Sequence, residues 1–482
     1  MVNLLTSSAI FFNFLRLAMA QEQNRAAQSV EVNNSLSPGN SNPSTNEAAG
    51  LGGANQVTSP PSGIAAEPQP AQSVEVNNSL SPGNSNPSTN EAAGLGGANQ
   101  VTSPPSGVAA EPQPAAQESE AADREAGQKK WLLLYNFTTG ITYDDNIFIS
   151  HQNKQADDVF TVSGGLTLGL GDYRDLQENY LLAQYLLAGF FYVQNSQENS
   201  PEQDLALRTQ FRFSKLTLQT QTRYEFLKGA NRQVGNFVSQ NLIDNLVRFA
   251  YDYSDKTRFF LSFEQITNLY KNYLSSYEYI GRSGGEYLIT AKIKLGGEAV
   301  IGTLDQESSP SGTFAQLRLL AAYGLTGKLS FQLGAGGEIR HYDSDGGLTR
   351  GTPVFSLGLT YHPFPDTSIV LTGNRNVNAS FSVAGENFVA TGLTVQLSQS
   401  LFRRLTLGTT AGYENDQYLA TQAGAAESGR VDNYFFIQPT LTYRFRNWLS
   451  ASLSYEFRRN ASNESSFTFS DNRVAISADA NF

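Results

Sequence analysis

The last nine residues of this chain alternate strictly between two kinds of side chain. Val474, Ile476 and Phe482 share one face with Ala478 and Ala480, while the positions between them are mostly polar. A period of two is the repeat of a β-strand, because successive side chains point to opposite faces of a sheet. A strand that is apolar on one face and polar on the other fits a wall between lipid and water.

The same alternation recurs from Lys129 to the end of the chain. It predicts an all-β fold, namely a transmembrane antiparallel up-and-down β-barrel of about 18 strands, with about 16 as the alternative count. Most of these strands exceed the roughly five or six residues usual in globular proteins. They match the roughly nine to eleven that a tilted membrane-spanning strand needs. The predicted strands are 131–144, 158–171, 178–194, 203–214, 216–228, 237–253, 257–271, 278–290, 292–304, 313–325, 328–342, 351–362, 367–381, 386–400, 404–419, 431–446, 448–459 and 466–482.

The links between these strands fall into two classes. Links after even-numbered strands are mostly tight, as at Ser214-Lys215, and links after odd-numbered strands are mostly longer and polar, as at 195–202. Short turns on one rim and long loops on the other are typical of a transmembrane barrel. Aromatic residues are expected at both rims, with Trp131 and Trp448 at the short-turn rim and Tyr143, Tyr192, Tyr342 and Tyr418 at the long-loop rim.

The composition excludes several other classes of protein. Beyond the N-terminus no apolar run approaches the ~18 residues that a membrane helix needs. The chain has no cysteine, which removes disulfides, thiolate chemistry and Cys-based zinc sites. The net charge is -11, and neither residues 1–128 nor the rest of the chain is basic enough to indicate nucleic acid as a partner.

Two segments precede the predicted barrel. Residues 1–20 combine an apolar core with an A-x-A site, Ala18-Met19-Ala20, and this predicts a secretory signal peptide. Residues 21–128 are rich in Pro, Ser, Asn and Gly, and 28–71 recurs almost unchanged as 72–115. Such a segment buries too little apolar surface to offset its ordering entropy, so we expect a disordered periplasmic arm with a direct repeat. The barrel itself is predicted over 129–482.

The first predicted hairpins resemble a known family. Four short segments carry the resemblance: Tyr143-Asp-Asp-Asn-Ile-Phe148, Asp157-Asp158, Gly171-Asp-Tyr173 and Glu178-Asn-Tyr180. They are similar to segments of the "putative β-barrel porin 2" class of outer-membrane β-barrel proteins. The resemblance implies a porin-type barrel in the outer membrane of a Gram-negative-type cell. The final strand is similar to the strand by which outer-membrane barrels are recognised for assembly, where a terminal Phe is typical. We therefore predict Phe482 as the assembly signal.

The sequence predicts neither catalysis nor a cofactor. Of the three histidines, His341 alone has acids close by, at Asp343 and Asp345. A histidine at a loop edge near acids is usually a solvated group, and general acid–base chemistry needs a convergent set of partners. His151 and His362 have no such partners in the sequence.

The first long loop is flanked by two pairs of acids. Asp144 and Asp145 precede it, and Asp157 and Asp158 follow it. Carboxylate oxygens are the ligands that Ca²⁺ prefers, so these acids could hold Ca²⁺ or bridge divalent ions to lipopolysaccharide. No diagnostic ligand spacing is present, and solvated loop acids fit the pattern better, so we predict no metal site.

Charged residues fall on the polar faces of the predicted strands. Facing lipid, each would cost about 2–4 kcal/mol at the midplane, so they belong in a watery interior. Arg208, Arg212 and Arg223 on neighbouring strands could form a basic ladder, or charges of mixed sign could neutralise one another along the wall. The pore-lining candidates are Arg208, Arg212, Arg223, Glu225, Arg248, Arg258, Glu264, Arg318 and Arg340.

The leading expectation is a porin-like channel for passive, weakly selective diffusion of small hydrophilic solutes. Barrels of about 16 to 18 strands leave an aqueous channel. The alternative is a structural or secretion-associated outer-membrane barrel, tethered to the periplasm or cell wall by its disordered arm. The expected partners are outer-membrane lipid, lipopolysaccharide, the barrel-assembly machinery and the solutes, with no nucleic acid. The sequence leaves the oligomeric state open.

Overall fold

The computed structural model describes residues 131–482, apart from 174–177, 327, 345–346 and 423–428. The predicted signal peptide (1–20) and the arm with its repeat (21–128) lie outside the described residues. Within the described part of the chain, the helical pieces are two short 3-10 turns, η1 (Ser196–Glu198) and η2 (Ser465–Phe467). No helix among these residues is long and apolar enough to cross a membrane.

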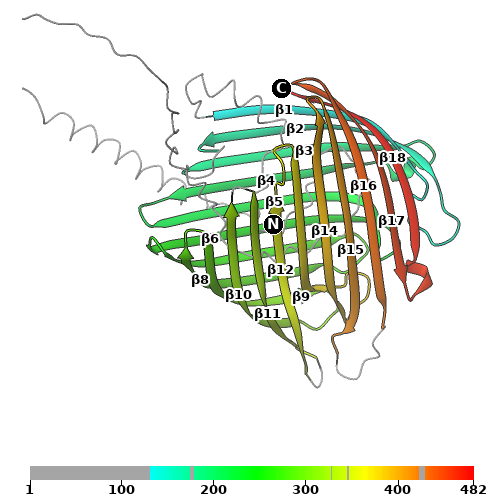
Figure 1. Cartoon of the computed structure of the whole chain (residues 1–482). Helices are drawn as coiled ribbons and strands as arrows, with labels where there is room; N and C mark the ends of the chain where they lie inside the picture. The colour runs from blue at the N-terminus through cyan, green and yellow to red at the C-terminus, as the bar shows by residue number, and fades with distance from the viewer. Residues whose placement is uncertain (1–130, 174–177, 327, 345–346, 423–428) are drawn as a thin grey trace, which may run out of the picture. The chain divides into compact units, whose positions relative to one another are not determined.

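Eighteen antiparallel strands form one closed sheet (Figure 1). Each strand pairs with its neighbours in sequence, and β1 pairs with both β2 and β18, so the ring has no free end. The strands are β1 (Trp131–Asp144), β2 (Asp157–Gly171), β3 (Tyr180–Tyr192), β4 (Ser200–Arg212), β5 (Leu216–Asn231), β6 (Asn236–Ser254), β7 (Thr257–Tyr270), β8 (Ser276–Thr290), β9 (Ile293–Gln306), β10 (Gly312–Thr326), β11 (Leu329–Tyr342), β12 (Leu348–Tyr361), β13 (Thr367–Ala379), β14 (Glu386–Phe402), β15 (Leu405–Ala420), β16 (Val431–Arg446), β17 (Leu449–Ser462) and β18 (Phe469–Asn481).

The predicted fold class is confirmed, and the strand count is eighteen rather than sixteen. The observed bounds of β1 and β16 are those predicted, 131–144 and 431–446. The largest differences fall at the strand ends beside loops. For example, β18 begins at Phe469 rather than at 466, because η2 occupies the preceding turn.

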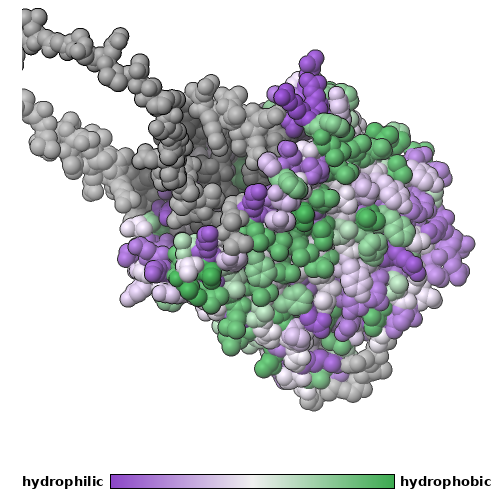
Figure 2. Space-filling view, viewed as in Figure 1, coloured by the Kyte–Doolittle hydropathy of each residue, from purple (hydrophilic) through white to green (hydrophobic). Residues whose placement is uncertain are grey.

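One face of the wall is apolar and exposed. On β1, Trp131, Tyr135 and Tyr143 are roughly half exposed, and on β18 so are Val474 and Ile476. Contiguous exposed apolar surface on this scale marks a face made for non-aqueous surroundings. Figure 2 shows hydrophobic residues across the middle of the visible wall and hydrophilic residues toward its ends. This arrangement fits the outward apolar band of a transmembrane barrel.

Three of the four tyrosines predicted at the long-loop rim face the interior of the barrel. Tyr143 is exposed on the outer face, but Tyr192, Tyr342 and Tyr418 are almost fully buried. Their positions in the strand pairing place them on the inward rows, opposite the exposed apolar rows. All four tyrosines lie at the predicted rim, and only Tyr143 faces outward, because alternation along each strand fixes the face on which a side chain lies.

The strand bounds also separate two rims. Turns at one rim are short, such as 255–256 after β6, 291–292 after β8 and 447–448 after β16. Loops at the other rim include 145–156 after β1 and 421–430 after β15. The link after β2, 172–179, is a long exception on the short-turn rim.

Phe482 completes the seam between β18 and β1. Its backbone amide donates to the carbonyl of Tyr135 at 2.8 Å, and its carbonyl accepts from the amide of Tyr135 at 3.0 Å. Its ring stacks on Trp448, with ring centroids 5.7 Å apart and an interplanar angle of 22°. The last residue thus joins the first strand, the last strand and the turn before β17.

Deleting Phe482 should impair assembly of the barrel before it impairs transport. The deletion removes two backbone hydrogen bonds and one aromatic stack, together worth roughly 2–4 kcal/mol. The folded fraction in isolated outer membranes, read from the mobility difference between heated and unheated samples on gels, should fall. Phe364→Ala is the matched control, since Phe364 is an exposed aromatic in the short turn after β12 and lies away from the seam. Normal insertion of the truncated chain would count against the assignment of Phe482.

Candidate functional site: the inner wall and the long-loop mouth

The pore-lining candidates all lie on the inward rows of the wall, opposite the exposed apolar rows. The pairing of neighbouring strands carries one inward row across the sheet, with Arg223 beside Asp244, Arg258 beside Glu286, and Arg318 beside Glu298. Most candidates are buried there rather than standing free in the interior. Buried are Glu225, Arg248, Glu264, Arg318 and Arg340, and partly buried are Arg208, Arg212, Arg223 and Arg258.

The predicted basic ladder on β4 and β5 is interrupted by acids. Arg223 forms ion pairs with Asp204, at 3.4 Å, and with Glu225 on its own strand. Asp204 stands on β4, the same strand as Arg208 and Arg212. The wall at this point therefore carries alternating signs, as in the neutralising alternative.

A second charged group lies on β7 to β11 and includes a residue that the sequence reasoning did not select. Arg282 on β8 pairs with Glu264 at 2.6 Å, and both side chains are almost fully enclosed. Arg340 pairs with Glu338 at 2.7 Å on β11 and covers the ring of Phe314, with Cζ 4.4 Å from the ring centroid. The period-two pattern of β8 could have identified Arg282, because it shares its face with Glu278 and Glu286.

Two further pore-lining candidates, Arg248 and Arg258, have different surroundings. Arg248 lies over the ring of Phe260, with Cζ 4.5 Å from the centroid. Arg258 binds Asp252 through two contacts of 2.6 and 3.2 Å and is about a quarter exposed. Two contacts of this kind fix the orientation of the guanidinium group and also balance its positive charge.

A third charged group bridges the seam on the inner side. Arg473 on β18 binds Asp144 on β1 at 2.8 Å and Glu456 on β17 at 3.5 Å. Arg458 binds Asp471 at 2.5 Å, and neither of these side chains is exposed. The seam that Phe482 joins at the short-turn rim is therefore also tied by charge near the long-loop rim.

The acids around the first long loop are bound by donors of the protein. Asp145 accepts from the backbone and side-chain nitrogens of Asn472 at 2.8 and 2.7 Å. Asp157 accepts from the backbone amides of residues 193–195, with contacts from 2.9 to 3.2 Å. Carboxylate oxygens of Asp144, Asp145 and Asp471 lie within 4.8 Å of one another, but two arginines already bind members of this group. These carboxylates therefore accept hydrogen bonds from protein groups at the seam between β18 and β1.

The histidine considered for catalysis stands on the outer surface. The His341 side chain is half exposed, with Nδ1 3.0 Å from the hydroxyl of Thr349 and Nε2 3.8 Å from Asp343. Asp345 lies outside the described residues. The His341 side chain faces away from the interior, so it does not contact the charged residues of the inner wall.

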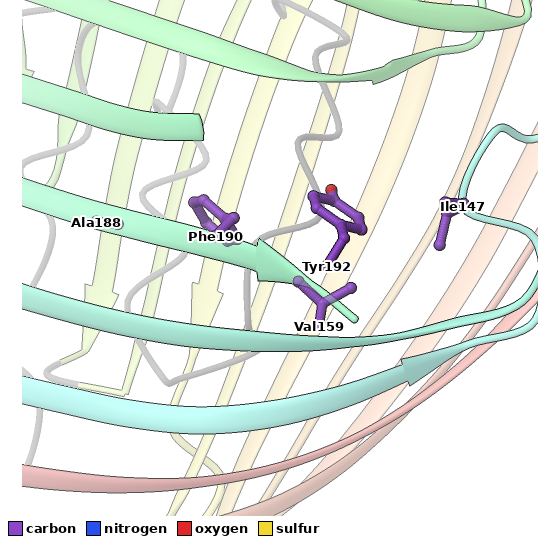
Figure 3. Packing of buried hydrophobic residues seen from close by; sticks show 5 residues of the cluster. All are labelled: Ile147, Val159, Ala188, Phe190 and Tyr192. Carbon is purple, nitrogen blue, oxygen red and sulfur yellow. The ribbon is translucent and has the colours of Figure 1, made fainter. Parts of the chain in front are cut away.

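Apolar side chains fill the inner wall near the long-loop rim. Figure 3 shows Phe190 and Tyr192 of β3 beside Val159 of β2, with Ile147 of the first loop turned toward them. Phe148 of the same loop packs edge-on against Phe237 of β6, with ring centroids 5.2 Å apart. Because β2 and β6 are not neighbours in the ring, this contact crosses part of the interior.

The turn between β5 and β6 reaches the opposite wall. β5 and β6 lie across the ring from β15 and β16 in strand order. Arg232, in this turn, pairs with Asp416 on β15 at 3.0 Å and with Glu414. In return Arg430, just before β16, donates to the carbonyl of Gln233 at 2.9 Å. Two arginines thus join the turn and the far wall in opposite directions.

The guanidinium of Arg430 is held on both faces and along its edge. Its Cζ lies 4.4 Å from the ring centroid of Tyr418 and 3.4 Å from that of Phe467. Its nitrogens bind Asp432 at 2.5 to 3.1 Å. Neither Arg232 nor Arg430 was selected from the sequence, because both lie outside regular strands, where alternation says nothing of direction.

Several polar atoms of the inner wall have no hydrogen-bond partner among the described protein atoms. They include both carboxylate oxygens of Glu298, Nε of Arg318, and Nε and Nη2 of Arg248. Nearly all buried polar groups in native proteins have a partner. Opposite charges lie close to these groups on neighbouring strands, as Glu298 does beside Arg318.

Together, the closed ring, the apolar outer face and the charged inner face define a transmembrane β-barrel. Residues 321–482 match the model of the family described as "Putative beta-barrel porin 2". This match confirms the family resemblance over those residues. It covers the last part of the barrel, whereas the motifs that carried the resemblance lie in the first hairpins.

Comparison with solved structures gives matches of low similarity. Pseudomonas aeruginosa OpdQ is 10% identical, with 73% of this chain and 98% of that chain covered and a TM-score of 0.38. Pseudomonas aeruginosa OccK5 (OpdH) is 11% identical, with 73% and 98% covered and a TM-score of 0.39. The siderophore receptor PirA from Pseudomonas aeruginosa is 12% identical, with 73% and 80% covered and a TM-score of 0.35. No curated protein matches the sequence.

Replacing Arg473 by Gln should destabilise the seam. The substitution leaves the enclosed carboxylate of Asp144 without its cation, and breaking a buried ion pair costs about 3–5 kcal/mol. The midpoint of urea unfolding in lipid vesicles should shift to lower concentration. Arg459→Gln on the exposed face of β17 is the matched control and should leave the midpoint unchanged. Equal midpoints for the two variants would show that the seam does not depend on Arg473.

Proposed function

We propose that this protein is a porin-like outer-membrane channel for passive, weakly selective diffusion of small hydrophilic solutes. The observation that carries the proposal is the contrast between the two faces of one closed ring, which is apolar outside and charged inside. Charged side chains in such rows belong against water, because facing lipid they would cost about 2–4 kcal/mol each. A ring of about 16 to 18 strands is wide enough for an aqueous passage.

Weak selectivity is supported by the pairing of charges along the wall. Arg282 with Glu264, Arg340 with Glu338, and Arg458 with Asp471 each place opposite signs side by side. Paired charges produce little net field in the lumen, so the wall attracts neither anions nor cations strongly. Solutes would then be separated mainly by size and polarity.

Recording across planar lipid bilayers tests the channel directly. The purified barrel should give stepwise conductance, and a salt gradient should give a reversal potential close to zero. Neutralising one inward arginine by Arg318→Gln should shift the preference toward cations, because Glu298 beside it keeps its charge. Arg459→Gln on the outer face is the control and should leave the reversal potential unchanged. A barrel without conductance steps would contradict the channel function.

The N-terminal segments belong to the same proposal. Residues 1–20 would serve as a removable export signal, and residues 21–128 would form a periplasmic arm preceding the barrel. Lipopolysaccharide around the rim and the barrel-assembly machinery at Phe482 are the partners that this location entails. The competing function, a structural or secretion-associated barrel tethered by the arm, depends on residues outside the described ones.

Deleting residues 28–115, which removes both copies of the repeat, separates the two functions. For a channel, uptake of small solutes into cells or vesicles should stay the same, because the wall from Trp131 to Asn481 is untouched. Envelope integrity is measured in parallel by leakage of a periplasmic enzyme. Unchanged uptake together with a leaking envelope would favour the tethering function.

A further inference from the structure

Three acids meet at the seam between β18 and β1, near the long-loop rim. Asp144 is the last residue of β1, Asp145 follows it in the chain, and Asp471 lies on β18. Each of them contributes one carboxylate oxygen to a group whose atoms all lie within 4.8 Å of one another. The sequence could not place Asp471 with the other two, because it lies near the opposite end of the chain. Closure of the barrel brings the three together.

Backbone pairing at the seam holds the start of the first long loop against β18. The amide of Asp145 donates to the carbonyl of Asn472 at 3.1 Å, and the amide of Asn472 donates to Oδ1 of Asp145 at 2.8 Å. The side chain of Asn146 donates to the carbonyl of Ser470 at 3.1 Å. The pairing of β1 with β18 therefore continues beyond the end of β1, and it fixes the positions of the carboxylates there.

One carboxylate oxygen of Asp471 has no donor. The Asp471 side chain is fully enclosed, and its Oδ2 accepts from Nε of Arg458 at 2.5 Å and lies 3.3 Å from Nε of Arg473. Its Oδ1 has no hydrogen-bond partner among the described protein atoms. An enclosed carboxylate oxygen that nothing binds is costly, because the loss of its hydration is not compensated. The free oxygen of Asp471 therefore points to a further ligand.

The carboxyl groups of Asp144 and Asp471 are also in hydrogen-bonding contact with each other. Both residues are fully buried. An ionised carboxylate can only accept hydrogen bonds, so two of them in contact repel each other unless something positive lies between them. A proton shared by the two groups can meet this need, and so can a metal cation that both groups bind.

The charges around the three acids favour a divalent cation over a proton. Arg473 binds Asp144, and Arg458 binds Asp471, so the group already contacts two guanidinium ions. Glu456 joins the group through Arg473 at 3.5 Å. These four carboxylates and two arginines carry a net charge of about -2 when all are ionised. One divalent cation would neutralise the group, whereas one proton would neutralise only half of the excess.

The geometry of the three acids suits Ca²⁺. This ion takes about 6–8 oxygen ligands at about 2.3–2.6 Å in flexible arrangements, so its ligand atoms lie at most about 5 Å apart. The three carboxylate oxygens meet this limit. A carboxylate has about four lone-pair sites, so a cation can share it with other partners. Asp144 and Asp145 can thus bind Ca²⁺ and keep the hydrogen bonds that Asn146 and Asn472 donate to them.

We propose that Asp144, Asp145 and Asp471 bind one Ca²⁺, which clamps the seam of the barrel. The ion joins the end of β1 and the start of the first long loop to β18, at the rim opposite Phe482. Arg458 and Arg473 stay bound to the same carboxylates and balance the remaining charge. The site corrects the expectation from the sequence that no metal is bound, and it does not depend on whether the barrel conducts.

Calcium binding to the purified full-length barrel in detergent micelles tests the site directly. After removal of metal ions with EGTA and dialysis, calorimetric titration with CaCl₂ at neutral pH should give one Ca²⁺ per barrel. The expected Kd is about 10⁻⁴–10⁻³ M, the range of extracellular calcium modules. A folded barrel that binds no Ca²⁺ would overturn the proposal and would assign a shared proton to Asp144 and Asp471.

Asp145→Asn is the main test variant, because Asp145 takes its hydrogen bonds from Asn472 and the barrel keeps both arginine pairs of the seam. Loss of one charged ligand should weaken Ca²⁺ binding at least about tenfold. Asp479→Asn is the matched control, since Asp479 also lies on β18 but accepts from Thr138 at 2.8 Å. It should bind Ca²⁺ like the natural protein. Equal affinities of Asp145→Asn and the natural protein would overturn the site.

Urea unfolding in lipid vesicles gives a second readout. A ligand that binds only the folded state shifts the unfolding equilibrium toward that state. The midpoint for the natural protein should therefore be higher in CaCl₂ than in EGTA, and Asp145→Asn should show nearly equal midpoints in the two solutions. Asp479→Asn should keep the difference. A midpoint of the natural protein that does not respond to Ca²⁺ would overturn the clamp.

Discussion

Backbone pairing is the constraint on which this structure depends. In a lipid bilayer no water is available for amides and carbonyls, so a sheet can cross it only as a closed ring. Here β18 closes on β1 through a continuous run of pairs, and the final residue extends that pairing to Tyr135. Closure then fixes the direction of every side chain. Apolar rows must face lipid, and the charged rows that remain have only the interior available.

The interior differs between the two ends of the barrel. Toward the short turns, the inward rows are polar or small, as in Thr217, Gln219 and Gln221 of β5. Toward the long loops, Arg232 in the β5–β6 turn pairs with Asp416 on β15, and the carbonyl of Phe381, between β13 and β14, accepts from the amide of Leu274, between β7 and β8. Contacts across the interior therefore join distant strands at the long-loop end of the barrel.

The sequence predicted the wall better than the mouth. Alternation identified all eighteen strands, and it placed Arg248, Glu264 and Arg340 on inward rows, because a period of two carries direction along a strand. It said less about side chains at and beyond the strand ends. Tyr192 and Tyr418 lie at the rim where they were predicted, but the sequence analysis did not state that they face inward. The contacts of Arg430 depend on packing between distant segments, which no local pattern records.

The ion pairs of this barrel also differ in how well they are shielded from bulk water. Arg232 and Asp416 are almost completely enclosed, whereas Lys228 and Glu198, which pair at 3.2 Å near the rim, are 24% and 20% exposed. Dissolved salt screens exposed charges over about 8 Å at physiological ionic strength, and it acts far less on enclosed ones. Changes of ionic strength should therefore weaken the pair of Lys228 and Glu198 before they weaken the pair of Arg232 and Asp416.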